Sequence, residues 1–406
     1  MSRRSIKFDL QVISLCAILI RIVLYNLFDY NKDFYTGDSI YYLDIGKNII
    51  LNGLHGENGV ESFYRPPLYS FFAGIVSSIY SNAIFFNIIQ SLLYICFSFV
   101  VYFLLRNYSE KLAFWSALLI SISPFDALMN GRVLAENLVT PCIVLSSLLF
   151  IKGRGYLTRY VVSGILLGAA ILCRDVYMLL PLLFWAVGVL KKISGRNLTA
   201  YVLCCLLMIG PWAFRNSQLK EGGVFLSKGI FWQNIWIGTW MQDWANDRKP
   251  MVDNPGEVPA NAIRAYPNIS PVIILDALKN EDQEFFKKST IQLIQTNPIK
   301  VISTWIKRYP LLWLGTRSDL NTVYLQPRST AWYLLKSMFY ILNLIIIALA
   351  IAGLFLALRS RNELSLLCIP ILYNGIIYIP FYNIETRYTL PVMPLLIILS
   401  VYFVVS

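Results

Sequence analysis

The sequence has a single histidine, His55, and no set of histidines and cysteines with the spacing of a zinc site. All seven cysteines lie inside apolar runs, and their spacing does not indicate a disulfide framework. We expect them to pack as small hydrophobic side chains. These cysteines are Cys16, Cys96, Cys142, Cys173, Cys204, Cys205 and Cys368. The pattern therefore argues against a zinc enzyme and against a disulfide-stapled domain.

Charged residues make up only 14% of the chain, whereas 57% of its 406 residues are hydrophobic. Repeated apolar runs of about 17–25 residues explain so much apolar mass, and they predict an all-α polytopic membrane protein. The ten predicted spans are 10–28, 83–105, 112–129, 133–151, 157–173, 175–190, 198–214, 331–358, 363–381 and 388–406. No small-residue cleavage site follows the first run, so we expect a retained span rather than a removed signal peptide.

Lysine and arginine are distributed unevenly among the connections between these spans. One set of connections carries 13 bases and three acids, so +10 of the formal net charge of +12 belongs to it. Because cytoplasmic loops are enriched in Lys and Arg, we assign this set, and with it both termini, to the cytoplasm. Its bases are Arg3, Arg4, Lys7, Arg106, Lys111, Lys152, Arg154, Arg159, Lys191, Lys192, Arg196, Arg359 and Arg361. The basic charge is thus a topology signal, and no nucleic-acid partner is expected.

The first extracytoplasmic loop, residues 29–82, carries the carboxylates Asp38 and Asp44 and a turn-rich stretch ending at Arg65. Pro66 and Pro67 follow, and apolar residues then recur at helical spacing as far as residue 79. The stretch 66–80 is too short and too one-sided to cross a bilayer, so we predict an interfacial helix lining a lateral entrance for a lipid chain. If it crossed the bilayer instead, every later basic loop would change sides.

Further charged residues stand at the ends of other spans, on the same predicted side as this loop. They are Arg132, Glu136, Arg174, Asp175, Arg215 and Arg387. Any one of these arginines is more often a snorkelling interface anchor. Several of them on one side, each beside Pro, Gly or an acid, favour a single shared cavity. His55 is a lone loop histidine, and such a side chain is more often just solvated than functional.

The region 216–330 is the only sizeable soluble part of the chain. Its aromatic stretch 231–244 is interpreted as an interfacial belt in preference to a sugar-stacking surface. Residues 249–275 are rich in Pro and Asn and are predicted to form a loop, and 281–295 are predicted to form a helix. Asn297 and Pro298 then begin a second predicted interfacial helix. We divide the chain into 1–215, 216–330 and 331–406.

Several motifs resemble, in order, those of the bacterial relatives of dolichyl-phosphate-mannose–protein mannosyltransferases, which include the aminoarabinose transferases of lipid A. Asp38 stands four residues before a tyrosine, and Arg-Pro-Pro-Leu-Tyr begins at Arg65. The order continues with Ser-Pro before Glu136, glycines before Arg174, Pro-Trp-x-x-Arg-Asn at 211–216 and Arg-Tyr-x-x-Pro-x-x-Pro at 387–394. The resemblance covers the whole chain except much of the region 240–330.

The resemblance implies a membrane glycosyltransferase of the GT-C fold that uses a polyprenyl-phosphate sugar donor. It makes Asp38 the catalytic base, although many relatives have Asp-Glu where this chain has Asp38 and Ser39. Breaking the sugar–phosphate bond needs cations, and the arginine fork suits a phosphate. The expected donor-phosphate-binding residues are Arg65, Arg215 and Arg387, and the expected second-shell or acceptor residues are Arg132, Glu136, Arg174 and Asp44.

The sequence leaves the sugar, the acceptor and the metal dependence open: a divalent cation is compatible with the carboxylates, and the acceptor could be a glycan, a lipid or a protein. A transporter or flippase of a lipid-linked saccharide is the alternative function. Transporters should show charges deep in spans and repeat symmetry, whereas here the charges gather at one face and we find no repeat. A catalytically inactive scaffold of the same fold also remains open. We expect residence in a bacterial inner membrane, with the active site on the extracytoplasmic face.

The charge pattern predicts opposite locations for residue 250 and residue 194. In intact cells, a membrane-impermeant thiol reagent should label Pro250→Cys directly and Ser194→Cys only after permeabilisation, because residue 194 lies in the basic loop 191–196. The cysteine-bearing chain without either substitution is the control. Labelling of Pro250→Cys only after permeabilisation would overturn the topology.

Overall fold

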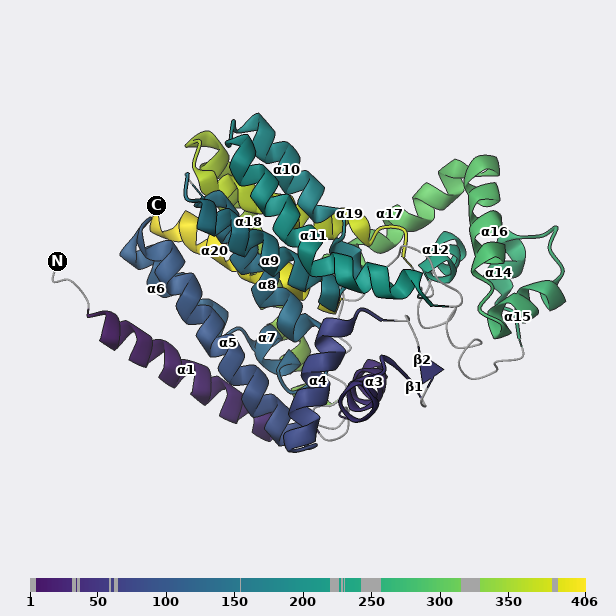
Figure 1. The fold of residues 1–406 in the computed structure, drawn as a ribbon, viewed down its shortest axis with the longest axis horizontal. Helices are drawn as coiled ribbons and strands as arrows, with labels where there is room; N and C mark the ends of the chain where they lie inside the picture. Colours follow the sequence, from purple (N-terminus) through teal and green to yellow (C-terminus); the bar gives the residue numbers. More distant parts are fainter. Residues whose placement is uncertain are drawn as a thin grey trace. The chain divides into compact units, whose positions relative to one another are not determined.

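A computed structural model describes residues 5–30, 34, 37–57, 60–61, 65–153, 155–219, 226–227, 229, 231–241, 257–314, 329–381 and 386–406. In these ranges the chain is almost wholly helical, as predicted (Figure 1). The strands β1 (Gly56–Glu57) and β2 (Val60–Glu61) form one short antiparallel hairpin. Arg3, Arg4 and Arg154 of the basic loops, and residues 242–256, lie outside the described ranges.

Each predicted span coincides with a helix or with two consecutive helical segments. They are α1 (Ile6–Leu27), α5 (Ala83–Arg106), α6 (Glu110–Ser121) with α7 (Pro124–Met129), α8 (Glu136–Ile151), α9 (Leu157–Cys173), η1 (Asp175–Tyr177) with α10 (Leu180–Leu190), α11 (Gly195–Ser217), α18 (Thr330–Arg359), η3 (Glu363–Leu367) with α19 (Cys368–Ile377), and η4 (Thr386–Val392) with α20 (Met393–Val405). Among the described residues, six helices are long and apolar enough to cross a membrane. The remaining helices that coincide with predicted spans are apolar but only 10–17 residues long.

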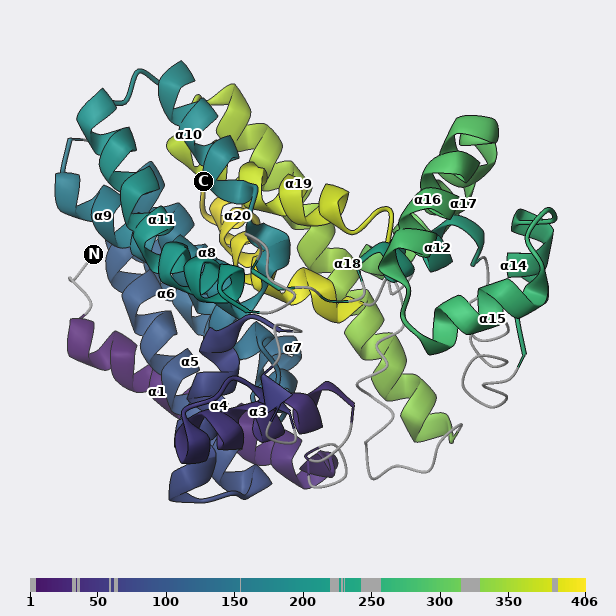
Figure 2. The ribbon, with the colours of Figure 1, turned by 45° about the vertical axis from the view of Figure 1, so that its right-hand side comes forward.

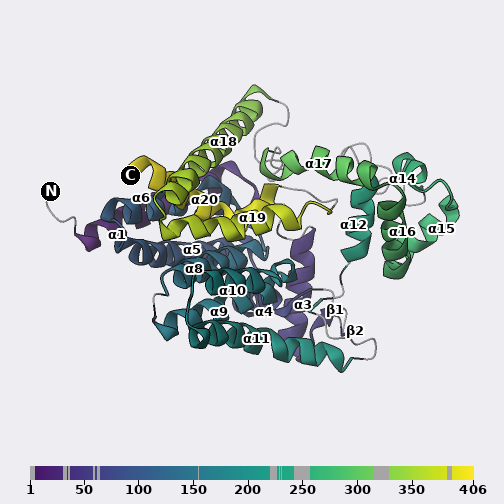
Figure 3. The same ribbon diagram turned by 90° about the horizontal axis from the view of Figure 1, so that it is seen from above.

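The chain divides into two compact units. The first comprises Met1–Ser227, Ser318–Tyr373 and Leu390–Ser406, and the second comprises Lys228–Arg317 and Asn374–Thr389. In the first unit, α9 lies along α11 (Figure 3). Glycine permits this approach, since a Cβ at Gly164 would lie 2.2 Å from the carbonyl oxygen of Tyr201. The two glycines before Arg174 therefore allow close packing of the helix that carries it.

The first unit has a basic end and an opposite end where the predicted site residues gather. Glu136 begins α8 and Lys152 follows that helix, which at 16 residues is about 24 Å long. Next, α9 runs back, and Arg174 directly follows its last residue. Three of the basic loops meet at the far end: Tyr108 donates to Glu363 (3.4 Å), and the Lys152 ammonium lies 4.7 Å from the centre of the Tyr108 ring. The structure thus separates the basic loops from Glu136 and Arg174 by the length of a helix.

The predicted helix after Arg65 is present as α4 (Pro67–Ile79), which packs against α3 (Asp38–Asn52). Ser70, Ala73 and Gly74 face inward, whereas Phe71, Ile75 and Ile79 are exposed along one side. At 13 residues, α4 is about 20 Å long, shorter than the roughly 30 Å hydrocarbon core of a bilayer. The length and the exposed stripe fit the interfacial position that the sequence predicts.

The second unit contains α12 (Phe231–Trp240), α14 (Ala260–Ala265), α15 (Pro271–Lys279), α16 (Gln283–Thr296) and α17 (Pro298–Leu314) (Figure 2). Trp236 and Trp240 are buried at its centre with Tyr266 and Phe286. The interpretation of these tryptophans as an interfacial belt is therefore wrong: the unit needs large side chains to fill its own core. The predicted loop at 249–275 is also wrong where it is described, because α14 and the start of α15 are helical there.

The predicted helices at 281–295 and after Asn297 are confirmed as α16 and α17. The Asp282 carboxylate caps α16 by accepting from the backbone N–H groups of Glu284 (3.1 Å) and Phe285 (3.0 Å). One side of α17 is exposed at Ile299, Ile302 and Ile306. Its other side is buried in the unit, so the exposed apolar side is free to face a membrane surface, as the sequence predicts.

The crossing of α3 and α4 generates a stability prediction. A Cβ at Gly74 would lie 2.3 Å from the carbonyl oxygen of Gly46, so Gly74→Ala must push the two backbones apart. We expect overpacking to lower the free energy of unfolding by about 1–3 kcal/mol, measured by denaturant unfolding in detergent. The control is Gly210→Ala in α11, where nothing lies within 4 Å of the added methyl group. Equal stability of both variants would show that the crossing tolerates separation.

Candidate functional site

Asp38 and Arg65 form an ion pair in the first unit, although 27 positions separate them in the sequence. Arg65 Nη2 lies 2.9 Å from Asp38 Oδ1. The pair is positioned by the packing of two helices, because Asp38 is the first residue of α3 and Arg65 lies two residues before α4. Gly37, with φ +54°, takes the N-cap position. Asp38 is thus the first residue inside the helix, where the helix N-terminus favours its negative charge.

Tyr42, one turn along α3, completes this first group. Arg65 Nη1 donates to the Tyr42 hydroxyl (3.3 Å), and the guanidinium carbon lies 4.8 Å from the centre of the Tyr42 ring. Burial raises the pKa of Tyr42, which keeps its phenol protonated. Tyr69 packs edge-on against the Tyr42 ring at 4.8 Å between centroids. Arg65 is therefore held by a carboxylate, a hydroxyl and an aromatic face at once.

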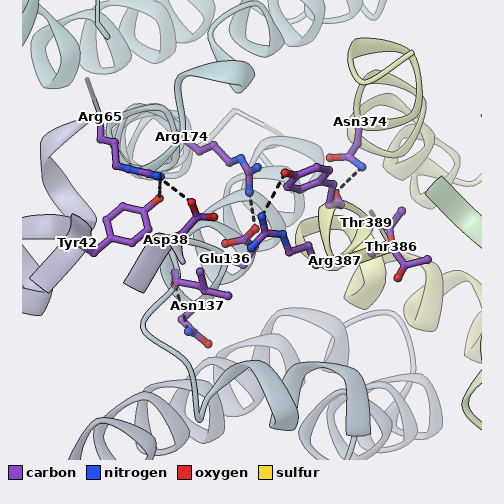
Figure 4. Close-up of polar contacts among 12 residues, drawn as sticks. Asp38, Tyr42, Arg65, Glu136, Asn137, Arg174, Asn374, Thr386, Arg387 and Thr389 are labelled. Atoms are coloured by element: carbon purple, nitrogen blue, oxygen red, sulfur yellow. Dashed lines mark hydrogen bonds and ion pairs between the residues drawn. The ribbon is translucent and has the colours of Figure 1, made fainter. Parts of the chain in front are cut away.

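Glu136 and Arg174 form a second ion pair, through Arg174 Nη1 and Glu136 Oε1. Only 4% of the Glu136 side chain and 22% of the Arg174 side chain are exposed. The Tyr42 phenol interacts electrostatically with Asp38 and Arg65 and also with Glu136 and Arg174. The two ion pairs therefore lie in one region, and Tyr42 contacts the Asp38–Arg65 pair (Figure 4). In the sequence, Tyr42 appears only as the tyrosine of the Asp-x-x-x-Tyr motif. No local pattern predicts that its phenol would be buried next to charged side chains.

Two further predicted residues, Arg132 and Asp44, have different surroundings. The carbonyl oxygen of Arg132 accepts from Gln90 Nε2 (3.0 Å) and Asn137 Nδ2 (2.9 Å), which fixes the turn just before α8. Asp44 is exposed on α3 six residues after Asp38, about a third of a turn away around the helix. That position does not direct Asp44 toward the Asp38 side of the helix.

Arg215 belongs to another group in the first unit, next to the β1–β2 hairpin. It donates to Glu61 Oε1 (3.0 Å) and to the carbonyl oxygen of His55 (3.3 Å), and its guanidinium lies over the Trp212 ring at 4.7 Å. His55 is only 5% exposed, and its ring packs edge-on against Trp212 at 4.6 Å. The expectation of a solvated histidine is wrong, because the end of α11 covers this loop.

Asp175, for which the sequence suggests no role, accepts a hydrogen bond from the Ser227 hydroxyl. The neighbouring carbonyl of Leu226 accepts from Trp212 Nε1 (2.8 Å) and Asn216 Nδ2 (3.2 Å). Asp175 thus helps to fasten residues 226–227 to the end of α11 and to the start of η1.

Arg387 lies in the second unit, at the start of η4. Its Nη2 donates to the Tyr388 hydroxyl (3.3 Å), and the Tyr388 ring stacks on Tyr378 at 4.8 Å with an interplanar angle of 7°. Asn374 Nδ2 donates to the carbonyl of Tyr388 (2.9 Å), which fixes the backbone beside Arg387. In the same unit, burial lowers the pKa of Arg308 to about 10.

Within the described part of the chain, no group of three or more His, Cys, Asp or Glu side chains could hold a metal ion. The carboxylates of Asp38 and Glu136 are each paired with an arginine instead. Each ion pair thus offers one guanidinium, which can bind a phosphate, and one carboxylate, which can accept a proton.

Comparison with known proteins gives a family match over part of the chain and a similar fold. Residues 64–214 match the family model of the dolichyl-phosphate-mannose-protein mannosyltransferases, a range that includes Arg65, Glu136 and Arg174 but not Asp38. No curated protein sequence matches the chain. Among solved structures, the archaeal oligosaccharyltransferase AglB from Archaeoglobus fulgidus, in complex with an inhibitory peptide and a dolichol-phosphate, has a TM-score of 0.54 and 16% identity.

An Archaeoglobus fulgidus oligosaccharyltransferase in the apo form gives a TM-score of 0.55 and 17% identity. The match to AglB covers 97% of this chain and 50% of AglB, so this chain spans about half the length of that relative. ArnT from Cupriavidus metallidurans, bound to undecaprenyl phosphate, aligns with 98% of this chain and 78% of its own at 14% identity, but its TM-score of 0.37 is too low to establish a shared fold. The matches confirm the GT-C fold class, and with its apolar helices the chain is an integral membrane protein.

Proposed function

We propose that this protein transfers a sugar from a polyprenyl-phosphate donor to an extracytoplasmic acceptor, with inversion at the anomeric carbon. The family match and the GT-C fold support this class of reaction. The observation that carries the proposal is the Asp38–Arg65 contact at 2.9 Å. It places a carboxylate next to a cation that can bind a phosphate. Displacement at the anomeric carbon needs both: a base for the attacking acceptor and a cation for the leaving phosphate.

The reaction is a single displacement. The acceptor hydroxyl or amine attacks the anomeric carbon while the bond from that carbon to the donor's phosphate oxygen breaks. The acceptor's proton passes to the Asp38 carboxylate, and the electron pair of the broken bond leaves with the polyprenyl phosphate. One displacement inverts the configuration, and the products are the glycosylated acceptor and the free polyprenyl phosphate.

Arg65 stabilises the leaving phosphate. A guanidinium has five N–H donors in a fixed fork, so Arg65 can contact a phosphate while it still contacts Asp38. The Arg65 side chain is 18% exposed and that of Asp38 is 33% exposed, so a substrate can reach both. As the phosphate leaves, its growing charge is balanced by a cation already in place. Arg387 and Arg215 are further phosphate-binding candidates, and Arg215 already forms an ion pair with Glu61.

Glu136 and Arg174 have a positioning role in this proposal. Their pair is more buried than the Asp38–Arg65 pair, so the accessible carboxylate reacts and the buried one orients. Glu136 fixes Arg174, and the Tyr42 phenol links both pairs electrostatically. The donor site is then lined by groups that need not rearrange during the reaction.

The location of the reaction follows the charge pattern. The basic loops around Tyr108, Lys152 and Glu363 lie at the opposite end of the first unit from Glu136 and Arg174. If these loops are cytoplasmic, as their charge predicts, the site faces the extracytoplasmic side of the membrane. We propose a bacterial inner-membrane enzyme with this site on the extracytoplasmic face and both termini in the cytoplasm. The acceptor there is a lipid, a glycan or a protein.

Asp38→Asn tests the base. Turnover of a radiolabelled undecaprenyl-phosphate sugar should fall by about 10²–10⁴-fold, because the amide cannot take the proton. The affinity for undecaprenyl phosphate should persist. The matched control is Asp44→Asn on the same helix, which changes an exposed carboxylate and should leave turnover unaltered. Near-normal transfer by Asp38→Asn would mean that Asp38 is structural.

Arg65→Ala and Arg387→Ala test the phosphate. Loss of a charge-assisted hydrogen bond should weaken binding of undecaprenyl phosphate by about 1.5–3 kcal/mol, measured by titration of the purified protein. Arg65→Lys should recover only part of the affinity, since an ammonium keeps the charge without the fork. Unchanged affinity in both alanine variants, with folded protein, would place the phosphate elsewhere.

A further inference from the structure

The first span contains a buried arginine that the sequence did not single out. Arg21 lies in α1 and is 8% exposed, whereas Ile18, Ile22 and Val23 on the other side of the helix are about half exposed. An arginine inside a membrane span is costly and almost always faces the interior of the helix bundle. Its electrostatic partners include Asp126 of α7, which is 2% exposed. Arg21 is therefore an interior charge whose contacts should explain its presence.

The guanidinium of Arg21 contacts the points where two neighbouring helices, α6 and α7, end. Nη1 donates to the carbonyl oxygen of Ser121 (2.8 Å), the last residue of α6, and to that of Ala17 (3.0 Å). Nη2 donates to Asn130 Oδ1 (2.9 Å), directly after α7. The last carbonyls of a helix have no partner within it, and a cation is favourable there. Arg21 thus joins the end of α6 to the turn that follows α7.

From Asn130 the contacts continue to the start of α8. Asn130 Nδ2 donates to Asn137 Oδ1 (3.0 Å). Asn137 Nδ2 in turn donates to the carbonyls of Met129 (3.0 Å) and Arg132 (2.9 Å). The side-chain amide of Asn137, the residue next to Glu136, therefore holds the turn between α7 and α8 by several hydrogen bonds.

Gln90 of α5 fastens the same turn from another side. Its Nε2 donates to the carbonyl of Asn130 (2.8 Å), and its Oε1 accepts from the Tyr69 hydroxyl (2.8 Å). Tyr69 packs edge-on against the ring of Tyr42, which contacts Arg65. Buried hydrogen bonds thus run from the first span to Asn137, next to Glu136, and through Gln90 to Tyr69, whose ring contacts Tyr42.

We propose that Arg21 is a positioning residue, which acts through Asn130 and Asn137 to hold Glu136 against Arg174 beside Tyr42. The inference rests on the proposed function, because it assigns Arg21 to the site that carries the reaction. A neutral side chain at position 21 would leave Asn130 Oδ1 and the Ser121 carbonyl without this donor. The turn would then repack, and Glu136 would move relative to Asp38 and Arg65.

The test compares Arg21→Met and Arg21→Lys with Arg106→Met in the full-length purified protein. Arg106 is the control because its partner, Glu110, is 3.5 Å away on an exposed surface at the basic end of α5. Turnover per folded molecule should fall by about 100-fold in Arg21→Met, the effect of a misplacement of about 1 Å. Affinity for undecaprenyl phosphate should stay unchanged, since Arg65 is intact. Arg21→Lys should lie between Arg21→Met and wild type, and the control should match wild type.

Amide hydrogen exchange gives a readout that does not depend on transfer. Peptides covering 131–137 should exchange faster in both Arg21 variants than in wild type and in Arg106→Met. If Arg21→Met does not fold, Arg21→Lys decides. Wild-type turnover per folded molecule or unchanged exchange at 131–137 would overturn the inference. If the wild-type protein transfers no sugar, the proposed function fails, and the exchange comparison alone still decides the role of Arg21.

Discussion

The contact between Asp38 and Arg65 depends on how closely two helix backbones can approach. Gly46 of α3 and Gly74 of α4 face each other without a Cβ on either side, so the helices cross in direct contact. Because Asp38 begins α3 and Arg65 precedes α4, this crossing sets the distance between the carboxylate and the guanidinium. Any side chain at the crossing would push apart the two helices that position the Asp38 carboxylate and the Arg65 guanidinium.

The two ion pairs differ in burial, and the difference fits a division of labour. Asp38 and Arg65 are open enough to meet a substrate, whereas the Glu136 carboxylate is almost wholly buried. A buried pair is costly to desolvate and rigid once formed. The turn before Glu136 is also held by polar contacts, through Asn137, Gln90 and Arg21. A site built in this way can present fixed charges to a donor whose own charge moves during the reaction.

Local patterns predicted most helices, and they failed where burial depends on distant residues. The apolar runs of the spans and the proline starts of α4 and α17 depend on neighbouring residues, so these helices appear close to the predicted ends. Trp236 and Trp240 were misjudged because an aromatic stretch looks the same in a core as at a membrane interface. His55 was misjudged because Trp212, which covers it, comes from a helix far along the chain.

The sequence by itself indicated a helical membrane protein of the GT-C class. It predicted one shared cavity for Asp38, Arg65, Glu136 and Arg174, but also for Arg132, Arg215 and Arg387. Hydropathy, charge asymmetry and motif order are properties of the chain as written, so they need no fold. Which carboxylate pairs with which arginine was decided only by the tertiary structure, as were the contact of Tyr42 with Arg65 and the contacts of Arg21 inside the first span. The physical reason is that these contacts join residues up to about a hundred positions apart, and helix packing alone sets their distances.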